Sequence, residues 1–413
     1  MSSRLGVARR LRQRATDTLA SQFQRRSANA LTQWLVRRFG PDRFRTSPPT
    51  PAAAHLETHA FRPTHFPQRG RSTRSLSAHD LVEAPRSPRN VTQLTCLDRA
   101  SIAPQVLTDL DAHAALEGLA RAGVPFELTD RTTQPNASGL AIGRHTAEAI
   151  SMPHRPGQIA RELRSVRIRR SAWRDSGLLT KSTVSVLLAS LRPDDLLGAI
   201  EQVNRQVDVD IQLIVGLHGP EWGDGWEQRI ARSSTHPLHV RRADAQTSFG
   251  ALLTMLWSAA DGTFVTKWDD DDVYGPHHLV DLVHGLLYSG AQLVGKAAEF
   301  VYLVESDRTI RRFAVGAESY ATSLAGGTLL AERAWMDTIG WWPAMRAGVD
   351  RHAIESTIAS GGRCYRTHGF EYVLRRSGDG GQHTWAAADS YFAQSAVEQR
   401  RGLDLSFAGF DDA

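Results

Sequence analysis

The pattern of apolar positions changes at Thr183, where short apolar runs begin to alternate with helical patterns. The runs at residues 184–189 and 211–217 are almost wholly apolar and rich in β-branched residues, as strands buried on both faces are. A third strand is predicted at residues 263–268. Around these strands, apolar positions recur at helical spacing over residues 193–203, 249–260 and 277–288. This alternation predicts a mostly parallel sheet with helices on both faces.

A smaller α+β module is predicted over residues 91–170. Its apolar positions between Leu107 and Ala120 fall at helical spacing, and Gly123 with Pro125 ends that helix. Two short strands and a helix follow, at residues 125–128, 140–142 and 145–150. The module has no recognisable catalytic constellation, so we expect it to pack on the larger domain or to contact a partner.

A basic segment and a linker are predicted before residue 91. Residues 1–45 contain eleven arginines against two aspartates, with apolar positions that allow partly helical structure. Such a segment either lies on an anionic membrane as an amphipathic helix or forms a solvated basic tail, and the sequence leaves both open. Residues 46–90 are a Pro-, Ser- and Arg-rich linker that cannot bury a core. No nucleic-acid partner is expected, because no nucleic-acid-binding motif accompanies the arginines.

The composition, with 41% hydrophobic and 23% charged residues, is typical of a globular protein. No run approaches the roughly 18 apolar residues of a membrane-spanning helix, and no secretory signal pattern begins the chain. We therefore expect a cytoplasmic protein, peripheral at the inner face of the plasma membrane if residues 1–45 bind lipid. Two cysteines, Cys96 and Cys364, are too few for a disulfide framework or a cysteine-metal cluster.

Four successive aspartates, Asp269 to Asp272, directly follow the strand at residues 263–268. Four adjacent carboxylates repel one another, and their place between a buried strand and a helix is costly unless positive charge occupies the site. Mg²⁺ or Mn²⁺, bound by carboxylates and by diphosphate oxygens, would supply that charge. The alternative is an acidic cluster at a helix N-terminus, favoured by the helix dipole. That alternative explains Asp272 but does not require the other three aspartates.

The order of these elements resembles the family 2 glycosyltransferases of GT-A fold, of the bacterial, actinobacterial type that assembles cell-surface glycans. The resemblance covers about residues 183–385 and rests on the first two strands, the helix that ends at Ala259–Gly262, and the strand that runs into a DxD-type motif. It implies a glycosyltransferase domain over residues 183–390, followed by a tail over 391–413. It also implies an inverting, metal-dependent transfer of sugar from a nucleotide-diphosphate donor to a hydroxyl of a glycan or lipid-linked acceptor.

The resemblance assigns the donor side of the site. Asp269 and Asp271 match the two DxD carboxylates, with Asp271 as the direct ligand of Mn²⁺ or Mg²⁺ and Asp269 near the nucleotide ribose as well. The residues implied in nucleotide-sugar binding are Ala189, Ser190, Arg192, Lys267, Asp269, Asp270 and Arg376. The second strand departs from the family pattern, because it ends in Gly216-Leu217-His218-Gly219 without an acidic residue. The resemblance therefore does not indicate which nucleotide base the donor carries.

The family places its catalytic base at the start of a helix after a Gly-rich segment, which here matches Asp350 in Gly348-Val349-Asp350-Arg351-His352. A carboxylate there would take the proton of the acceptor hydroxyl as its oxygen attacks the sugar. The alternative is that Asp350 only caps the helix, a frequent role of aspartate.

The remaining candidates lie near the acceptor and in the last loop. Gly326 and Gly327 resemble the family's acceptor-side turn, and Trp341 and Trp342 could stack on sugar rings. The loop at residues 375–385 carries Arg376, which could cover a diphosphate, and His383, which could be a third metal ligand. The alternatives are an ordinary strand entrance, core aromatics and a structural histidine.

Three other functions remain open. A catalytically inactive nucleotide-sugar-binding module would keep the fold but lose the base or the metal pair, and the sequence contains both. A membrane-recruited scaffold would depend on residues 1–45 and not on the acidic run. A nucleotidyltransferase also uses paired carboxylates, but it normally has a Gly-rich basic loop near the first strand, which residues 190–195 do not provide.

Overall fold

The structure is a computed structural model, and it contains two compact units, residues 1–48 and 49–413. The described residues all belong to the second unit: 73–76, 99–102, 116–117, 120–121, 123–124, 126–128, 143–152, 157–177, 182–312, 317–340, 342–376, 392–394 and 396–410. The basic segment 1–45 and most of the linker 46–90 lie outside them. Within the described residues, no helix combines the length and apolar character that a membrane crossing requires.

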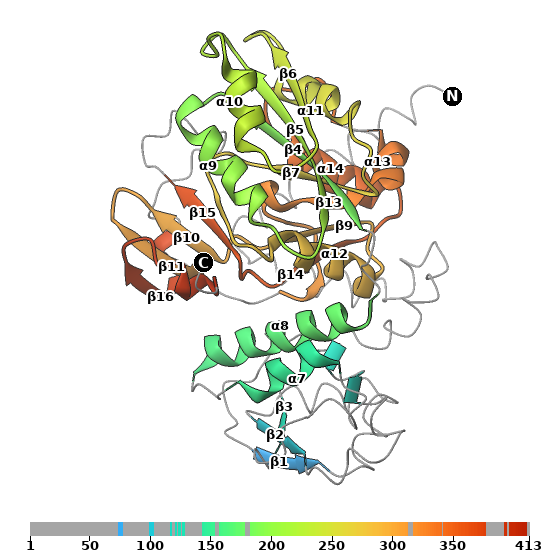
Figure 1. The fold of residues 1–413 in the computed structure, drawn as a ribbon, viewed down its shortest axis with the longest axis vertical. Coiled ribbons are helices and arrows are strands. Elements are labelled where there is room, and N and C mark those ends of the chain that lie inside the picture. The colour runs from blue at the N-terminus through green and yellow to red at the C-terminus, as the bar shows by residue number, and fades with distance from the viewer. Residues whose placement is uncertain are drawn as a thin grey trace, which may run out of the picture. The chain divides into compact units, whose positions relative to one another are not determined.

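The core of the second unit is a mixed sheet with the strand order β12-β14-β9-β13-β7-β4-β5-β6 (Figure 1). Its strands are β4 (Thr183–Ser190), β5 (Asp210–His218), β6 (Leu238–Ala243), β7 (Phe264–Trp268), β9 (Leu293–Lys296), β12 (Ser319–Tyr320), β13 (Leu330–Glu332) and β14 (Cys364–Thr367). The run β7-β4-β5-β6 is parallel, whereas β13 is antiparallel to both of its neighbours. The three predicted strands are β4, β5 and β7.

Helices cover both faces of this sheet. On β4, Val186 and Leu188 pack in one hydrophobic cluster and Leu187 in the other, which explains why the strand reads as a continuous apolar run. The first cluster includes α9 (Pro193–Asn204), α10 (Trp226–Ser233) and α12 (His278–Ser289), and the second α11 (Phe249–Trp257), α13 (Arg333–Ile339) and α14 (Val349–Ala359). The predicted fold class, an α/β sheet flanked by helices, is confirmed.

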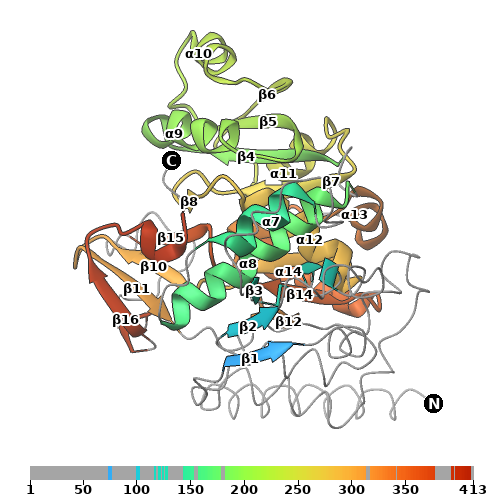
Figure 2. The same ribbon diagram turned by 60° about the horizontal axis from the view of Figure 1, so that its bottom comes forward.

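A second sheet, with the order β16-β11-β10-β15-β8, was not predicted from the sequence (Figure 2). It consists of β8 (Val273–Tyr274), β10 (Phe300–Leu303), β11 (Arg308–Arg312), β15 (Tyr372–Arg376) and β16 (Ala396–Arg401). The segment 391–413, predicted as a tail, instead contributes β16, and the buried ring of Phe407 packs against Phe300. Because β8 pairs with β15, this sheet holds the C-terminal end of the acidic run.

The N-terminal module contains a small parallel sheet of β1 (Thr73–Leu76), β2 (Arg99–Ile102) and β3 (Phe126–Leu128), and the helices α7 (Arg144–Ser151) and α8 (Gln158–Asp175). β3 and α7 match a predicted strand and helix, whereas β1 lies within residues 46–90, which were predicted as a linker. Most of the helix predicted between Leu107 and Ala120, and the strand at 140–142, lie outside the described residues. The predicted module boundary at residue 170 falls inside α8, which the sequence reading missed.

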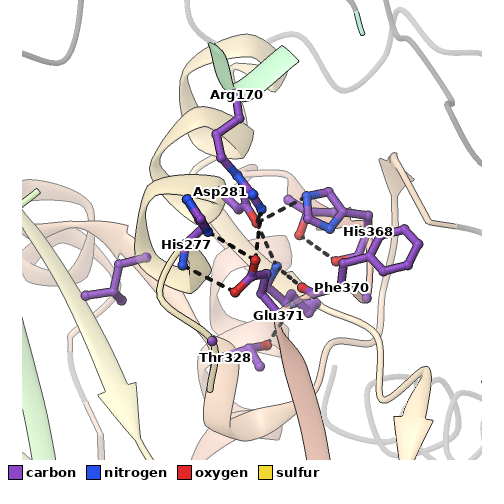
Figure 3. A network of polar contacts seen from close by, with 12 residues as sticks. Arg170, His277, Asp281, Thr328, His368, Phe370 and Glu371 are labelled. Atoms are coloured by element: carbon purple, nitrogen blue, oxygen red, sulfur yellow. Dashed lines mark hydrogen bonds and ion pairs between the residues drawn. The ribbon is translucent and has the colours of Figure 1, made fainter. Parts of the chain in front are cut away.

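Buried ion pairs attach α8 to the large domain (Figure 3). Arg170 donates two hydrogen bonds, of 3.0 and 2.9 Å, to Asp281 of α12, and its Nη2 lies 3.5 Å from Glu371 Oε1. Burial opposes the ionised form of Asp281, but the charges of Arg170, His368 and Lys296 outweigh it and hold the pKa of that carboxyl well below its usual range. The helix is therefore held to the large domain by buried ion pairs.

We expect Arg170→Met to lower the free energy of unfolding by about 3 kcal/mol, because the buried Asp281 carboxylate then loses the guanidinium that balances its charge. Urea unfolding followed by circular dichroism measures the change. The matched control is Arg144→Met on α7, whose exposed pair with Glu148 should contribute less than about 1 kcal/mol. Equal losses in both variants would contradict a docking role for α8.

Candidate active site

The acidic run connects β7 to β8 at the carboxyl ends of the parallel strands, where ligands bind in sheets of this kind. Its side chains alternate in exposure. Asp269 and Asp271 are 29% and 19% exposed, whereas Asp270 is 4% exposed and Asp272 is buried. The two DxD carboxylates expected from the sequence are thus the two that reach solvent.

The inward-facing Asp270 is held by the end of β4. The hydroxyl of Ser190 donates to Asp270 Oδ2 at 2.5 Å, and the guanidinium of Arg192 donates to the same carboxylate. Burial raises the pKa of Asp270, and the bond from Arg192 opposes that shift. Arg192 also lies 3.1 Å from Asp271 Oδ2, and Ala189 precedes this turn on β4. The structure therefore brings the predicted first-strand turn onto the acidic run.

The other inward carboxylate, Asp272, is held by β15. It accepts hydrogen bonds from the Tyr372 hydroxyl at 2.7 Å and from the Arg375 backbone N–H at 3.0 Å. Burial raises the pKa of Asp272 well above its usual value, and the charges of Asp271 and Asp269 act in the same direction. No pattern in the sequence indicates Tyr372, because its strand belongs to the unpredicted second sheet.

The predicted base, Asp350, lies beside the acidic run. Lys267 Nζ is 2.6 Å from Asp269 Oδ1 and 3.3 Å from Asp350 Oδ1. Burial raises the pKa of Asp269 to about 6, and the charges of Asp350 and Asp271 also raise it while Lys267 lowers it. Asp350 is in the first turn of α14, whose N-cap residue is Gly348. Asp350 is therefore not the N-cap residue of this helix.

The Gly326-Gly327 turn packs directly on both carboxylates. A Cβ atom on Gly326 would lie 2.1 Å from Asp350 Oδ2. One on Gly327 would lie 2.7 Å from Asp269 Oδ2 and 2.7 Å from the Tyr274 hydroxyl. That hydroxyl donates to the Gly327 carbonyl at 3.0 Å and accepts the Asp269 backbone N–H at 3.1 Å. Any side chain on this turn would displace the carboxylates, so the two glycines are required here.

The remaining predicted residues are placed elsewhere or lie outside the described residues. Trp342 is 5% exposed and packs in the core with α11, where its carbonyl accepts the Thr254 hydroxyl at 2.9 Å. The expectation that Trp342 stacks on a sugar is therefore wrong, because its ring is buried in the core. Arg376 is buried on β15 with its guanidinium 5.3 Å from the Phe392 ring centre. Trp341 and His383 lie outside the described residues.

The charge of the acidic run fits a divalent cation. Lys267 and Arg192 contact the run, but they supply two positive charges against the four aspartates and Asp350. These two side chains supply part of the positive charge that the sequence predicts at the run, and a cation would supply more. In the described part of the chain, no group of three or more His, Cys, Asp or Glu side chains is placed to hold a metal. Asp269 and Asp271 could serve as two ligands, with further oxygens coming from a diphosphate.

No protein-family model and no curated protein matches the sequence. Among solved structures, S. aureus TarS is similar over 47% of this chain and 37% of its own, at 12% identity and a TM-score of 0.37. TarS residues 1–349 in complex with UDP-GlcNAc match over 47% and 58%, at 12% identity and a TM-score of 0.38. The mannosyltransferase PcManGT from Pyrobaculum calidifontis, in complex with GDP-Man and Mn²⁺, matches over 49% and 59%, at 14% identity and a TM-score of 0.37. Each match spans less than two thirds of the solved chain.

Proposed function

We propose that this chain is a metal-dependent, inverting glycosyltransferase of GT-A type, which moves a sugar from a nucleotide-diphosphate donor to an acceptor hydroxyl. The observation that carries the proposal is the placement of Asp350 beside the acidic run at the carboxyl ends of the sheet, where Lys267 lies between it and Asp269, one of the two outward carboxylates of the run. The other outward carboxylate, Asp271, offers a second ligand for a cation, so the site has a place for a cation and a separate place for a base.

On the donor side, Asp269 and Asp271 would hold Mn²⁺ or Mg²⁺ together with the diphosphate. The cation supplies a Lewis acid that stabilises negative charge on the departing nucleotide diphosphate. Ser190 and Arg192 hold the acidic run from the β4 side and fix the orientation of Asp270 beneath it. Arg192 is also placed to contact a phosphate when Asp271 turns to the cation.

On the acceptor side, Asp350 takes the proton. The acceptor oxygen forms a bond to the anomeric carbon while the bond from that carbon to the diphosphate oxygen breaks. The proton of the hydroxyl passes to the Asp350 carboxylate, and the bonding electron pair leaves with the diphosphate. Gly326 supports this role, because the absence of a side chain lets the turn approach Asp350 Oδ2 without displacing the carboxylate.

The acceptor proposed from the sequence resemblance is a glycan or a lipid-linked hydroxyl of the cell surface. Residues 1–45 carry eleven arginines, and contact with an anionic membrane would bring the enzyme to such an acceptor. This part of the proposal rests on the sequence alone. It is independent of the assignment of the catalytic residues.

A panel of UDP- and GDP-sugars, incubated with the protein and Mn²⁺ or EDTA, tests the proposal by chromatography of the products. We expect release of a nucleoside diphosphate from one donor, abolished by EDTA. Release of a sugar 1-phosphate would instead identify a nucleotidyltransferase, and release of a nucleoside monophosphate a phosphosugar transferase. Binding of a donor without any turnover, across a range of acceptors, would favour the inactive binding module.

A further inference from the structure

Lys267, which the resemblance implies in nucleotide-sugar binding, has no role in the transfer step proposed above. The residue lies on β7, two positions before Asp269, and it is only 4% exposed. Its Nζ is shared between Asp269 and Asp350, and it lies 5.6 Å from the centre of the Phe249 ring. One ammonium thus joins the proposed donor side to the proposed base.

Two carboxylates face this ammonium. Its Nζ lies 2.6 Å from Asp269 Oδ1 and 3.3 Å from Asp350 Oδ1, and the side chain is almost closed to solvent. A buried cation between two carboxylates is held in place, because its removal would leave two like charges facing each other. Lys267 therefore fixes the position of Asp350 relative to Asp269.

The geometry at Asp350 shows what its contact with Lys267 would do. Lys267 contacts Oδ1, whereas Oδ2 lies against Gly326, where a Cβ atom would come within 2.1 Å. One carboxylate oxygen is thereby occupied by the lysine, and the other is left beside the glycine turn. Without the ammonium, Asp350 and Asp269 would repel each other and Asp350 would turn away from this position.

Building on the function proposed above, we propose that Lys267 is a positioning residue for sugar transfer, which holds Asp350 with Oδ2 directed at the acceptor hydroxyl and links that carboxylate to Asp269. Lys267 exchanges no proton in the reaction. The acceptor proton still passes to Asp350, and the ammonium stays charged throughout. Its contribution is to orientation, which enzymes depend on strongly because small displacements of a reacting group are costly.

A second buried lysine provides a matched comparison. Lys296 is fully buried, its Nζ donates to the Phe370 carbonyl at 2.7 Å, and it lies 3.5 Å from Asp281. These contacts belong to the ion pairs that hold α8, away from the acidic run. Lys296 is therefore a structural lysine in a similar environment, and replacing it should reduce stability without a specific effect on catalysis.

The experiment compares Lys267→Ala, Lys267→Met and Lys296→Ala in the full chain, with the donor found in the screen above. We expect kcat of both Lys267 variants to fall by about 10²-fold while KM for the donor changes less than about threefold. Ethylammonium or propylammonium ions should restore at least tenfold of the loss in Lys267→Ala. They should not restore Lys267→Met, whose side chain fills the space, or Lys296→Ala.

Several results would overturn the inference. A folded Lys267→Ala protein with kcat within threefold of wild type would show that Lys267 is not needed to position Asp350. An unchanged kcat with a raised KM for the donor would make Lys267 a donor-binding residue only. If Lys267→Ala does not fold, Lys267→Met gives the same comparison of kcat and KM. Absence of transfer by the wild-type protein would instead overturn the proposed function, together with the positioning role of Lys267 that rests on it.

Discussion

Asp350→Asn should lower the rate of sugar transfer by about 10²-fold or more, while donor affinity stays near wild type. Asparagine keeps the size of the side chain but cannot accept a proton. The loss should appear in kcat, because Lys267 separates Asp350 from Asp269, the carboxylate proposed to hold the donor. Steady-state kinetics give kcat and KM, and calorimetry with the nucleoside diphosphate and Mn²⁺ gives donor affinity.

The matched control is Glu355→Gln, which removes a carboxylate from the same helix. Glu355 is exposed and pairs with Arg351 at 3.1 Å, so its replacement should leave both kcat and stability nearly unchanged. Asp350→Asn should cost about 1–3 kcal/mol of stability, because the buried Lys267 ammonium loses one of its two charged partners. Transfer at nearly full rate in Asp350→Asn would leave this residue with no role beyond the first turn of α14.

The sequence predicts the parallel part of the sheet because burial on both faces leaves a clear signal. In β4 the residues Val186, Leu187 and Leu188 pack alternately into two hydrophobic clusters, so no polar residue interrupts them. The acidic run is equally visible, since four aspartates at the end of such a strand have few structural explanations. Asp350 could be located only through the resemblance to a known family.

The missed elements have charged residues where apolar ones are usually expected. The buried face of α8 includes Glu162, Arg169 and Arg170, whose partners are Arg311, Glu318 and Asp281 in other parts of the chain. Hydrophobic periodicity cannot detect a face that is buried through ion pairs. The strands β11 and β16 are likewise short and rich in arginine, and they join the sheet by pairing with each other and, in the case of β11, with β10.

The positive charge around the acidic run is another feature that the sequence alone does not show. Along the chain, the four carboxylates have only Lys267 as a basic neighbour. The fold brings Arg192 from the end of β4 and the hydroxyl of Tyr372 from β15. Long-range contacts of this kind do not follow from local spacing. They leave Asp269 and Asp271 as the outward pair for a cation.

Asp271→Ala should abolish metal-dependent binding of the donor, with a loss of at least about 10²-fold in affinity, and leave the fold intact. Asp271 is more exposed than Asp270, and it pairs with Arg192, which retains Asp270 as a partner when Asp271 is removed. Calorimetry with a nucleoside diphosphate, with and without Mn²⁺, measures the effect. Urea unfolding of the same protein shows whether the fold is preserved.

The contrast with Asp270→Ala makes the test specific. Asp270 is buried and accepts hydrogen bonds from Ser190 and Arg192, so its loss leaves buried donors without a partner and should cost about 1–3 kcal/mol of stability. Asp271→Ala should cost much less, because its carboxylate is partly exposed. A folded Asp271→Ala protein that keeps its metal-dependent affinity would place the cation elsewhere. Asp269 would then need another explanation for its exposure beside Gly327.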